Sequence, residues 1–356
     1  MEPKKYEYID SLRGIAILLV ILVHTGFVLE YTMYFFPQWL INIVHSGQYG
    51  VQLFFIVSAF TLTMSHYNRL NEPNKNKSFF IRRFFRIAPM IYFILIYYIF
   101  YEIDWDLSRF GETKWTDIFA SMTFTQTLFS GMNKYFPGGW TVSVEFLFYM
   151  MLPFLCTKIK NLNSSILFVV IALLFIPFYE LVFDKINLKF IFFVNHYSIF
   201  YQLPVFALGI FAYWMINDKN KEIKNSTLLL LLGTILLFCF VELPHHFPFA
   251  LAFTALLILL QRRPYKFLSN KILAKVGLVS YSMYIIHFPV VHFLNYIKFS
   301  RMIPVTDFYS SLLSFIIMCI VIIAITYPIS YITYKLIEVP GQNLGRKLIK
   351  KINQQK

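Results

Sequence analysis

Charged residues are scarce in this chain of 356 residues: 14% are Asp, Glu, Lys or Arg, against about 25% in an average globular protein. Apolar residues make up 58% of the chain, and the mean hydropathy is +0.61. The imbalance extends along the whole sequence, which excludes a soluble protein with one anchor and favours an all-α, polytopic membrane bundle. Acidic residues are fewer than basic ones, 18 against 32. Because the basic residues lie between apolar runs, we expect no nucleic-acid partner.

Cysteine and several catalytic motifs are also rare or missing. The three cysteines, Cys156, Cys239 and Cys319, lie inside or at the end of apolar runs, and they offer neither a disulfide framework nor a zinc-ligand spacing. The sequence has no nucleophile elbow, Gly-rich phosphate loop or HExxH motif. We therefore expect no bound metal and no permanently bound cofactor.

Ten apolar runs approach the length of about 20 residues that a helix needs to cross a bilayer. An eleventh stretch, 117–132, is shorter and rich in Thr, Ser, Gln and Phe. The first run carries Asp10 and Arg13 at its start and has no cleavage site behind it, so it is predicted to be a span and not a signal peptide. The predicted spans are 10–30, 48–66, 87–102, 140–157, 164–183, 198–216, 226–243, 247–261, 277–297 and 310–334.

The distribution of Lys and Arg decides whether the eleventh stretch crosses. If it does not cross and the amino terminus is inside, most basic residues fall in cytoplasmic loops, as the positive-inside rule requires. If it crosses, this asymmetry is lost. We therefore predict ten spans, both termini cytoplasmic, and 117–132 as a re-entrant or interfacial segment beside a site. Residues 1–335 then form one domain in the cell membrane, and 336–356 form a basic cytoplasmic tail.

Ionisable side chains inside spans are costly, so each suggests a function. Arg13 and His24 are eleven residues apart in the first span and share one helix face. Arg13 lies at the cytoplasmic edge, where it could equally extend to lipid phosphates. His24 lies roughly 21 Å into the membrane. Because its neighbours are Ile, Leu and Val, His24 needs a polar partner.

Glu145 is the predicted partner of His24. Its helix enters from outside near Trp140, which places Glu145 roughly 7 Å below the outer boundary, within one turn of the depth of His24. A carboxylate beside a histidine fixes its tautomer, as a general base requires. The alternative is that Glu145 only forms a hydrogen bond to a neighbouring helix.

Two further sets of residues are candidates for a site. Arg83 and Arg86, three apart before the third span, share a face and point to the cytoplasmic mouth where Arg13 lies. Basic residues there could simply set topology, but arginine forks also suit the phosphates of a donor bound from the cytoplasm. Tyr284 and His287 share a face of the ninth predicted span, where they either line a cavity or hold helices together.

These residues fall into motifs that resemble, in the same order, those of the acyltransferase-3 family of integral membrane acyltransferases. The resemblance covers about residues 6–335, with one departure: Ser58-Ala59-Phe60 replaces the common Ser-Gly-Phe. Longer family members carry a fused extracytoplasmic SGNH hydrolase-like domain, which we do not expect here. The matching motifs are Arg-x10-His (Arg13, His24), GVxLFFxxS (Gly50 to Ser58), Arg-x-x-Arg (Arg83, Arg86), Trp-x4-Glu (Trp140, Glu145) with Tyr149 and Pro153, and SYSxYxxHxP (Ser280 to Pro289).

The resemblance implies a membrane O-acyltransferase that moves an acyl group, acetyl before others, from cytoplasmic acyl-CoA to a hydroxyl of an envelope or surface polysaccharide. It implies three partners: acetyl-CoA as donor substrate, membrane lipid, and a glycan or lipid-linked sugar acceptor. Two alternatives stay open: a transporter or glycan flippase, and a structural subunit of an envelope machine. The implied site has His24 and Glu145 as catalytic residues, Arg13, Arg83 and Arg86 as the donor site, and Ser58, Trp140, Tyr284 and His287 as cavity lining.

Overall fold

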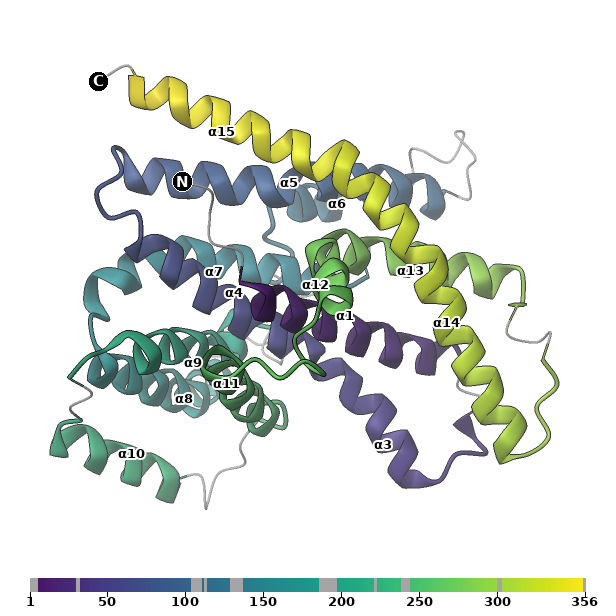
Figure 1. Ribbon diagram of the computed structural model, residues 1–356, viewed down its shortest axis with the longest axis horizontal. Coiled ribbons are helices and arrows are strands. Elements are labelled where there is room, and N and C mark those ends of the chain that lie inside the picture. The colour runs from purple at the N-terminus through teal and green to yellow at the C-terminus, as the bar shows by residue number, and fades with distance from the viewer. Residues whose placement is uncertain are drawn as a thin grey trace. The chain divides into compact units, whose positions relative to one another are not determined.

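Helices make up all the regular structure that the computed structural model describes (Figure 1). Seven helices are long and apolar enough to cross a membrane, or eight if a bent pair counts as one span. The chain is therefore an all-α membrane protein, as its composition predicts. The described residues are 6–29, 33–103, 111, 114–128, 137–185, 197–220, 223–237, 244–299 and 303–354.

The helices follow the order of the predicted spans closely. They are α1 (Glu7–Val28), α3 (Gln38–Ser46), η1 (Gly47–Tyr49), α4 (Gly50–Tyr67), α5 (Lys75–Glu102), α6 (Trp115–Met122), α7 (Gly139–Lys158), α8 (Leu162–Lys185), α9 (Ile199–Asn217), α10 (Asn225–Leu237), α11 (Phe247–Arg262), α12 (Lys271–Leu278), α13 (Ser280–Tyr296), α14 (Phe308–Thr333), η5 (Tyr334–Glu338) and α15 (Val339–Gln354).

Three of the ten predicted spans depart from single long helices. The prediction at 226–243 extends past α10 into residues outside the described ranges, and α11 has only 16 residues. The prediction at 277–297 falls on α12 and α13, whose axes are bent by 72° at the break between them. Helix length alone therefore supports seven or eight spans, and the count of ten stays a prediction.

The segment predicted not to cross, 117–132, contains no long helix in its described part. It begins in the eight-residue α6, which ends before Phe124, a residue with a positive φ of 58°. Helix α6 packs on α5, and Phe124 stacks near Tyr92 of that helix. Residues 129–132 lie outside the described ranges. A helix of about 12 Å cannot cross the hydrocarbon core, so the described part is consistent with an interfacial or re-entrant segment.

The chain divides into two compact units, which are described separately. Unit 1 comprises residues 1–54 and 259–337 and is built around α1, which contacts α3, α12, α13 and α14. Glycines allow α1 and α12 to approach closely: a Cβ on Gly277 would overlap the carbonyl oxygen of Asp10, and one on Gly14 would overlap that of Leu273. Helix α1 is therefore held at its amino-terminal end by backbone-to-backbone packing.

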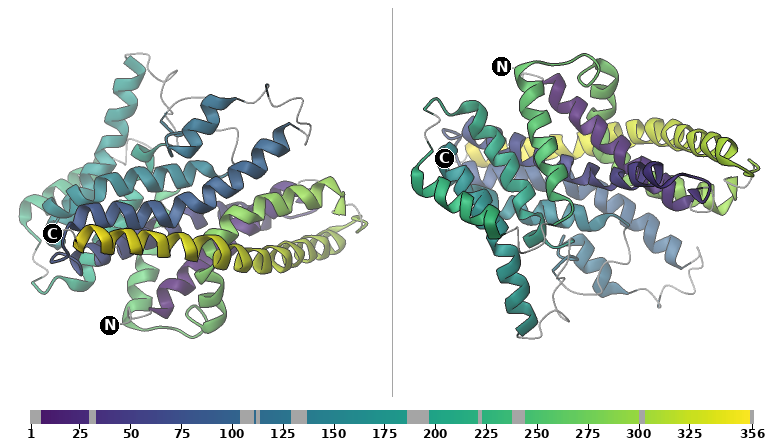
Figure 2. Two further views of the ribbon diagram at one scale, coloured as in Figure 1. Left: turned by 90° about the horizontal axis from the view of Figure 1, so that it is seen from above. Right: turned by 90° about the horizontal axis from the view of Figure 1, so that it is seen from below.

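Unit 2 comprises residues 55–258 and 338–356. Helix α9 packs on both α7 and α8, and α5 contacts α7 and α6. Phe206 of α9 stacks on Phe55 of α4 and on Phe148 of α7, with ring centroids 4.6 and 4.1 Å apart. The basic residues predicted as a tail form α15, which runs along α5 (Figures 1 and 2). These contacts position α4, α5 and α7 around one group of polar side chains.

Candidate functional site

His24 holds a defined tautomer in unit 1. Its Nδ1 lies 2.7 Å from the carbonyl oxygen of Val20, one turn earlier in α1. A carbonyl oxygen only accepts hydrogen bonds, so Nδ1 carries the hydrogen and the lone pair of the ring is on Nε2. The side chain is partly exposed. His24 therefore presents an acceptor nitrogen that can take a proton or attack a carbonyl carbon.

A second histidine is the polar neighbour of His24 within unit 1. The ring of His287, from α13, lies 5.0 Å from that of His24, and Phe288 lies 4.6 Å away, centroid to centroid. Sequence reasoning predicted that His24 needs a polar partner but did not pair these two residues. The sequence singled out His287 through the SYSxYxxHxP motif and through the face that it shares with Tyr284, whose ring lies 5.7 Å from it.

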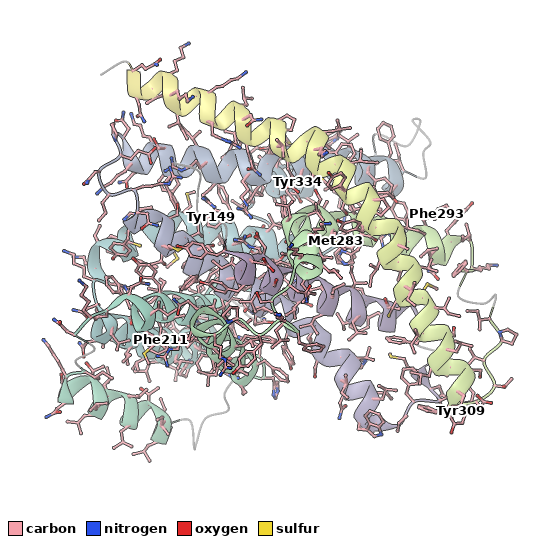
Figure 3. The ribbon with its side chains drawn as sticks, viewed as in Figure 1. Tyr149, Phe211, Met283, Phe293, Tyr309 and Tyr334 are labelled. Carbon is pink, nitrogen blue, oxygen red and sulfur yellow. The ribbon has the colours of Figure 1, made fainter. Side chains whose placement is uncertain are left out.

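His287 is fully buried, with 0% of its surface exposed. Its Nδ1 donates to the carbonyl oxygen of Met283 at 3.1 Å, and Met283 is labelled on α13 in Figure 3. The Nε2 atom has no hydrogen-bond partner among the described residues. Buried polar atoms without a partner are rare and often belong to functional sites. The two imidazoles therefore present two acceptor nitrogens in one region of unit 1.

In unit 2, Glu145 of α7 is the centre of a polar network. The hydroxyl of Ser58, from α4, donates to Oε1 of Glu145. The hydroxyl of Tyr149, one turn further along α7, also forms a hydrogen bond with this carboxylate. Tyr149, which is labelled in Figure 3, is buried, whereas Ser58 and Glu145 are partly exposed. The carboxylate is thus fixed from one side and accessible from another.

Two arginines of α5 face the same network. The Arg83 guanidinium lies 6.0 Å from the ring of Tyr149 and interacts electrostatically with Glu145. Its Nε is buried without a hydrogen-bond partner among the described residues. Arg86 interacts electrostatically with Tyr149. By contrast, Arg82 forms a 2.8 Å ion pair with Glu72, so its partner differs from those of Arg83 and Arg86.

The remaining candidates have local partners. Arg13 forms a 3.2 Å ion pair with Asp10, three residues earlier in α1. The ring of Trp140 lies 4.9 Å from Tyr197 and 6.3 Å from Phe55. These contacts place Trp140 in an aromatic group at the start of α7.

The predicted site residues divide between the two units. Unit 1 contains Arg13, His24, Tyr284 and His287, and brings the last three together. Unit 2 brings Ser58, Arg83, Arg86 and Glu145 together and holds Trp140 nearby in the chain. The contact of His24 with Glu145, and that of Arg13 with the other arginines, stay predictions. No group of three or more His, Cys, Asp or Glu in the described ranges could hold a metal ion.

Comparison with known proteins gives a family. The sequence profile of the family described as an acyltransferase domain, Acyl_transf_3, matches residues 6–331. The peptidoglycan O-acetyltransferase OatA of Listeria monocytogenes is 24% identical over 80% of this chain and 49% of its own length. A Staphylococcus aureus protein (strain COL) named as a candidate O-acetyltransferase is 23% identical over 97% of this chain and 59% of its own length.

The chain spans less than two thirds of the length of either relative. No solved structure matches it. The family profile covers nearly the whole sequence, including His24 and His287, the Ser58–Glu145 pair and the arginines of α5. The chain belongs to the acyltransferase-3 family of acyltransferase domains.

Proposed function

We propose that this protein is a membrane O-acyltransferase that moves an acyl group, acetyl before others, from cytoplasmic acyl-CoA to a hydroxyl of an envelope polysaccharide. Family membership and two relatives named as O-acetyltransferases support the reaction class. The observation that carries the proposal is the hydrogen bond from Nδ1 of His24 to Val20, because it leaves Nε2 with a lone pair inside a transmembrane helix.

The chemistry proposed for His24 is general base catalysis. Nε2 takes the proton of the acceptor hydroxyl while the hydroxyl oxygen bonds to the acyl carbon and the bond from that carbon to its carrier breaks. The carrier is either the CoA sulfur, in direct transfer, or an acylated side chain of the enzyme. If His24 is itself the acylated side chain, its Nε2 holds the acyl group and another base takes the proton. The proton then reaches the leaving atom, which regenerates the neutral imidazole. We propose that Glu145 orients His24 and stabilises the imidazolium during this step.

The donor site proposed here uses Arg13, Arg83 and Arg86. Acyl-CoA carries several phosphate groups, and guanidinium forks bind phosphate oxygens through paired, charge-assisted hydrogen bonds. The buried Nε of Arg83, which has no partner in the described part of the chain, is a donor available to such a ligand. The pantetheine arm is thin enough to reach between helices towards the polar groups in the membrane.

The proposed topology places donor and acceptor on opposite sides. Ten spans with both termini cytoplasmic put most Lys and Arg inside and the start of α7 outside. The location that we propose is the plasma membrane, where the outer face meets the envelope glycan. Reporter enzymes fused after each predicted loop test this arrangement, and a carboxyl-terminal reporter active only outside the cell would contradict it.

The decisive experiment compares envelope glycans of the gene deletion with those of cells that carry the wild-type gene or His24→Ala. NMR of the purified glycan should show an O-acyl ester in cells with the wild-type gene. This ester should be missing from the deletion strain and from cells that carry His24→Ala. The control is His45→Ala, an exposed histidine of α3, which should restore the ester. A glycan that moves across the membrane without any ester would identify a transporter, and a normal ester level in His24→Ala would remove the catalytic role.

A further inference from the structure

The hydroxyl of Ser58 differs from the two threonine hydroxyls of α4. Thr61 and Thr63 donate to backbone carbonyls one turn earlier in their own helix, Val57 and Ala59, at 2.8 and 2.7 Å. This is the usual arrangement for a hydroxyl in a helix. Ser58 instead donates to Oε1 of Glu145 on another helix. A hydroxyl bonded to a carboxylate is positioned to lose its proton, which a hydroxyl bonded to a carbonyl is not.

The carboxylate that receives this hydrogen bond is itself held in place. The buried hydroxyl of Tyr149 forms a hydrogen bond with Glu145, and Arg83 attracts it electrostatically. A nucleophile within hydrogen-bond reach of a base that a third group orients is the signature of activated nucleophiles in enzymes. Ser58 and Glu145 are both partly exposed, so a substrate can reach them. Arg83 also offers a buried Nε donor for a substrate oxygen.

We propose that Ser58 is a covalent acyl carrier and Glu145 its base, an inference that rests on the proposed O-acyltransferase function. Oγ of Ser58 attacks the carbonyl carbon of the acyl thioester, and an oxygen–carbon bond forms while the carbon–sulfur bond breaks. The proton of the hydroxyl moves to Oε1 of Glu145 and then to the CoA sulfur, which leaves as a thiol. The product is an ester on Ser58, and no oxidant or reductant is needed.

The second half of the reaction returns the enzyme to its starting state. The oxygen of the acceptor hydroxyl attacks the ester carbon, and the bond between that carbon and Oγ of Ser58 breaks. The acceptor hydroxyl loses its proton to the base of the proposed function, and Oγ of Ser58 takes up one proton. Ser58 and Glu145 therefore unload the donor, whereas activation of the acceptor stays with the role proposed above for His24. Ser58 is thus assigned as the enzyme-bound acyl carrier, which the proposed function leaves open.

The test uses the purified full chain in liposomes with radiolabelled acetyl-CoA and no acceptor. The wild type should take up covalent label, which mass spectrometry places on Ser58, and it should exchange label between acetyl-CoA and free CoA. Ser58→Ala should lose both signals, and Glu145→Gln should slow the exchange by about 100-fold or more. Thr63→Val, which removes a hydroxyl from the same helix, should retain both.

A second variant keeps the test valid if Ser58→Ala fails to fold. Ser58→Cys retains a nucleophile, and its acyl adduct is a thioester that hydroxylamine cleaves at neutral pH, whereas the serine ester requires alkaline conditions. Label on His24, wild-type glycan acylation by Ser58→Ala, or no label on a wild-type enzyme that makes the ester would each overturn the carrier role and leave the proposed function intact. A wild type that makes no ester at all contradicts the proposed function itself.

Discussion

The Nδ1 atom of His24 lies 2.7 Å from the carbonyl oxygen of Val20, one helical turn earlier in the same helix. This bond needs no partner from another helix, so α1 alone determines which nitrogen of the imidazole carries the hydrogen. His287 repeats the arrangement in α13 with the carbonyl oxygen of Met283. In both rings Nε2 is therefore the acceptor nitrogen.

The variant His24→Asn tests the roles of the two imidazole nitrogens separately. The asparagine amide can take the place of Nδ1–H and donate to Val20, but it offers nothing at the position of Nε2. We expect His24→Asn to fold like the wild type and to transfer acyl groups about 100-fold or more slowly. Product formation measured beside thermal unfolding in detergent checks this. Wild-type transfer by His24→Asn would mean that the histidine serves only to bond α1.

Replacing His287 with leucine should affect stability and activity in opposite ways. Leucine removes the desolvation cost of the unpartnered Nε2, about 1–3 kcal/mol, and this outweighs the Nδ1 bond to Met283 that it also loses, about 1 kcal/mol. We expect the thermal stability of His287→Leu to equal or exceed that of the wild type, while transfer falls by about 10- to 100-fold because His24 loses its neighbour. Melting curves and transfer rates, measured on the same preparation, provide the check.

The control for that variant is His246→Leu. His246 is also buried, but its Nε2 is 3.2 Å from the carbonyl oxygen of Tyr201 and has a partner to lose. We expect this variant to be destabilised by about 1–3 kcal/mol. If His287→Leu lowers the melting temperature by as much as His246→Leu does, His287 is a structural residue, and its buried Nε2 is not an acceptor kept for a substrate.

Glycines at two positions should respond oppositely to alanine. A Cβ on Gly277 would overlap the backbone carbonyl of Asp10, whereas nothing lies within 4 Å of a Cβ on Gly233 in α10. We expect Gly277→Ala to destabilise unit 1 by about 1–3 kcal/mol through overpacking, and Gly233→Ala to add about 0.5–1 kcal/mol through helix propensity. Thermal unfolding of both variants tests this, and equal melting temperatures would show that α1 and α12 can move apart.

The sequence predicted the helices well because their signal is local. Apolar runs of sufficient length fall on α1, α4, α5, α7, α8, α9 and α14, and the scarcity of charge follows from the same requirement. It did not predict the 72° bend between α12 and α13, because the apolar run continues through the break at Val279 and a single nearby glycine, Gly277, is also tolerated in straight membrane helices. Composition detects that a segment is apolar, not whether its axis is straight.

The site was predicted as a set of residues but not as a set of pairs. His24 and Glu145 were identified because ionisable groups inside spans are costly. Arg83 was identified because it lies with Arg86 before the third span, where arginines suit the phosphates of a donor. Depth was the only criterion for pairing, and it cannot distinguish helices that lie side by side from helices on opposite sides of a bundle. The hydrogen bond from Ser58 to Glu145 and the proximity of His287 to His24 depend on packing between helices, which one sequence does not specify.

The two arginines of α5 that face Tyr149 and Glu145 should determine donor affinity. Each guanidinium that binds a phosphate through charge-assisted hydrogen bonds contributes about 1.5–3 kcal/mol. We expect Arg83→Ala combined with Arg86→Ala to raise the Kd for acetyl-CoA by at least about 100-fold. Arg82→Ala is the matched control, because Arg82 is occupied by Glu72 and should leave the Kd unchanged. Calorimetric titration of the purified protein measures all three, and equal affinity in the double variant and the wild type would remove these arginines from the donor site.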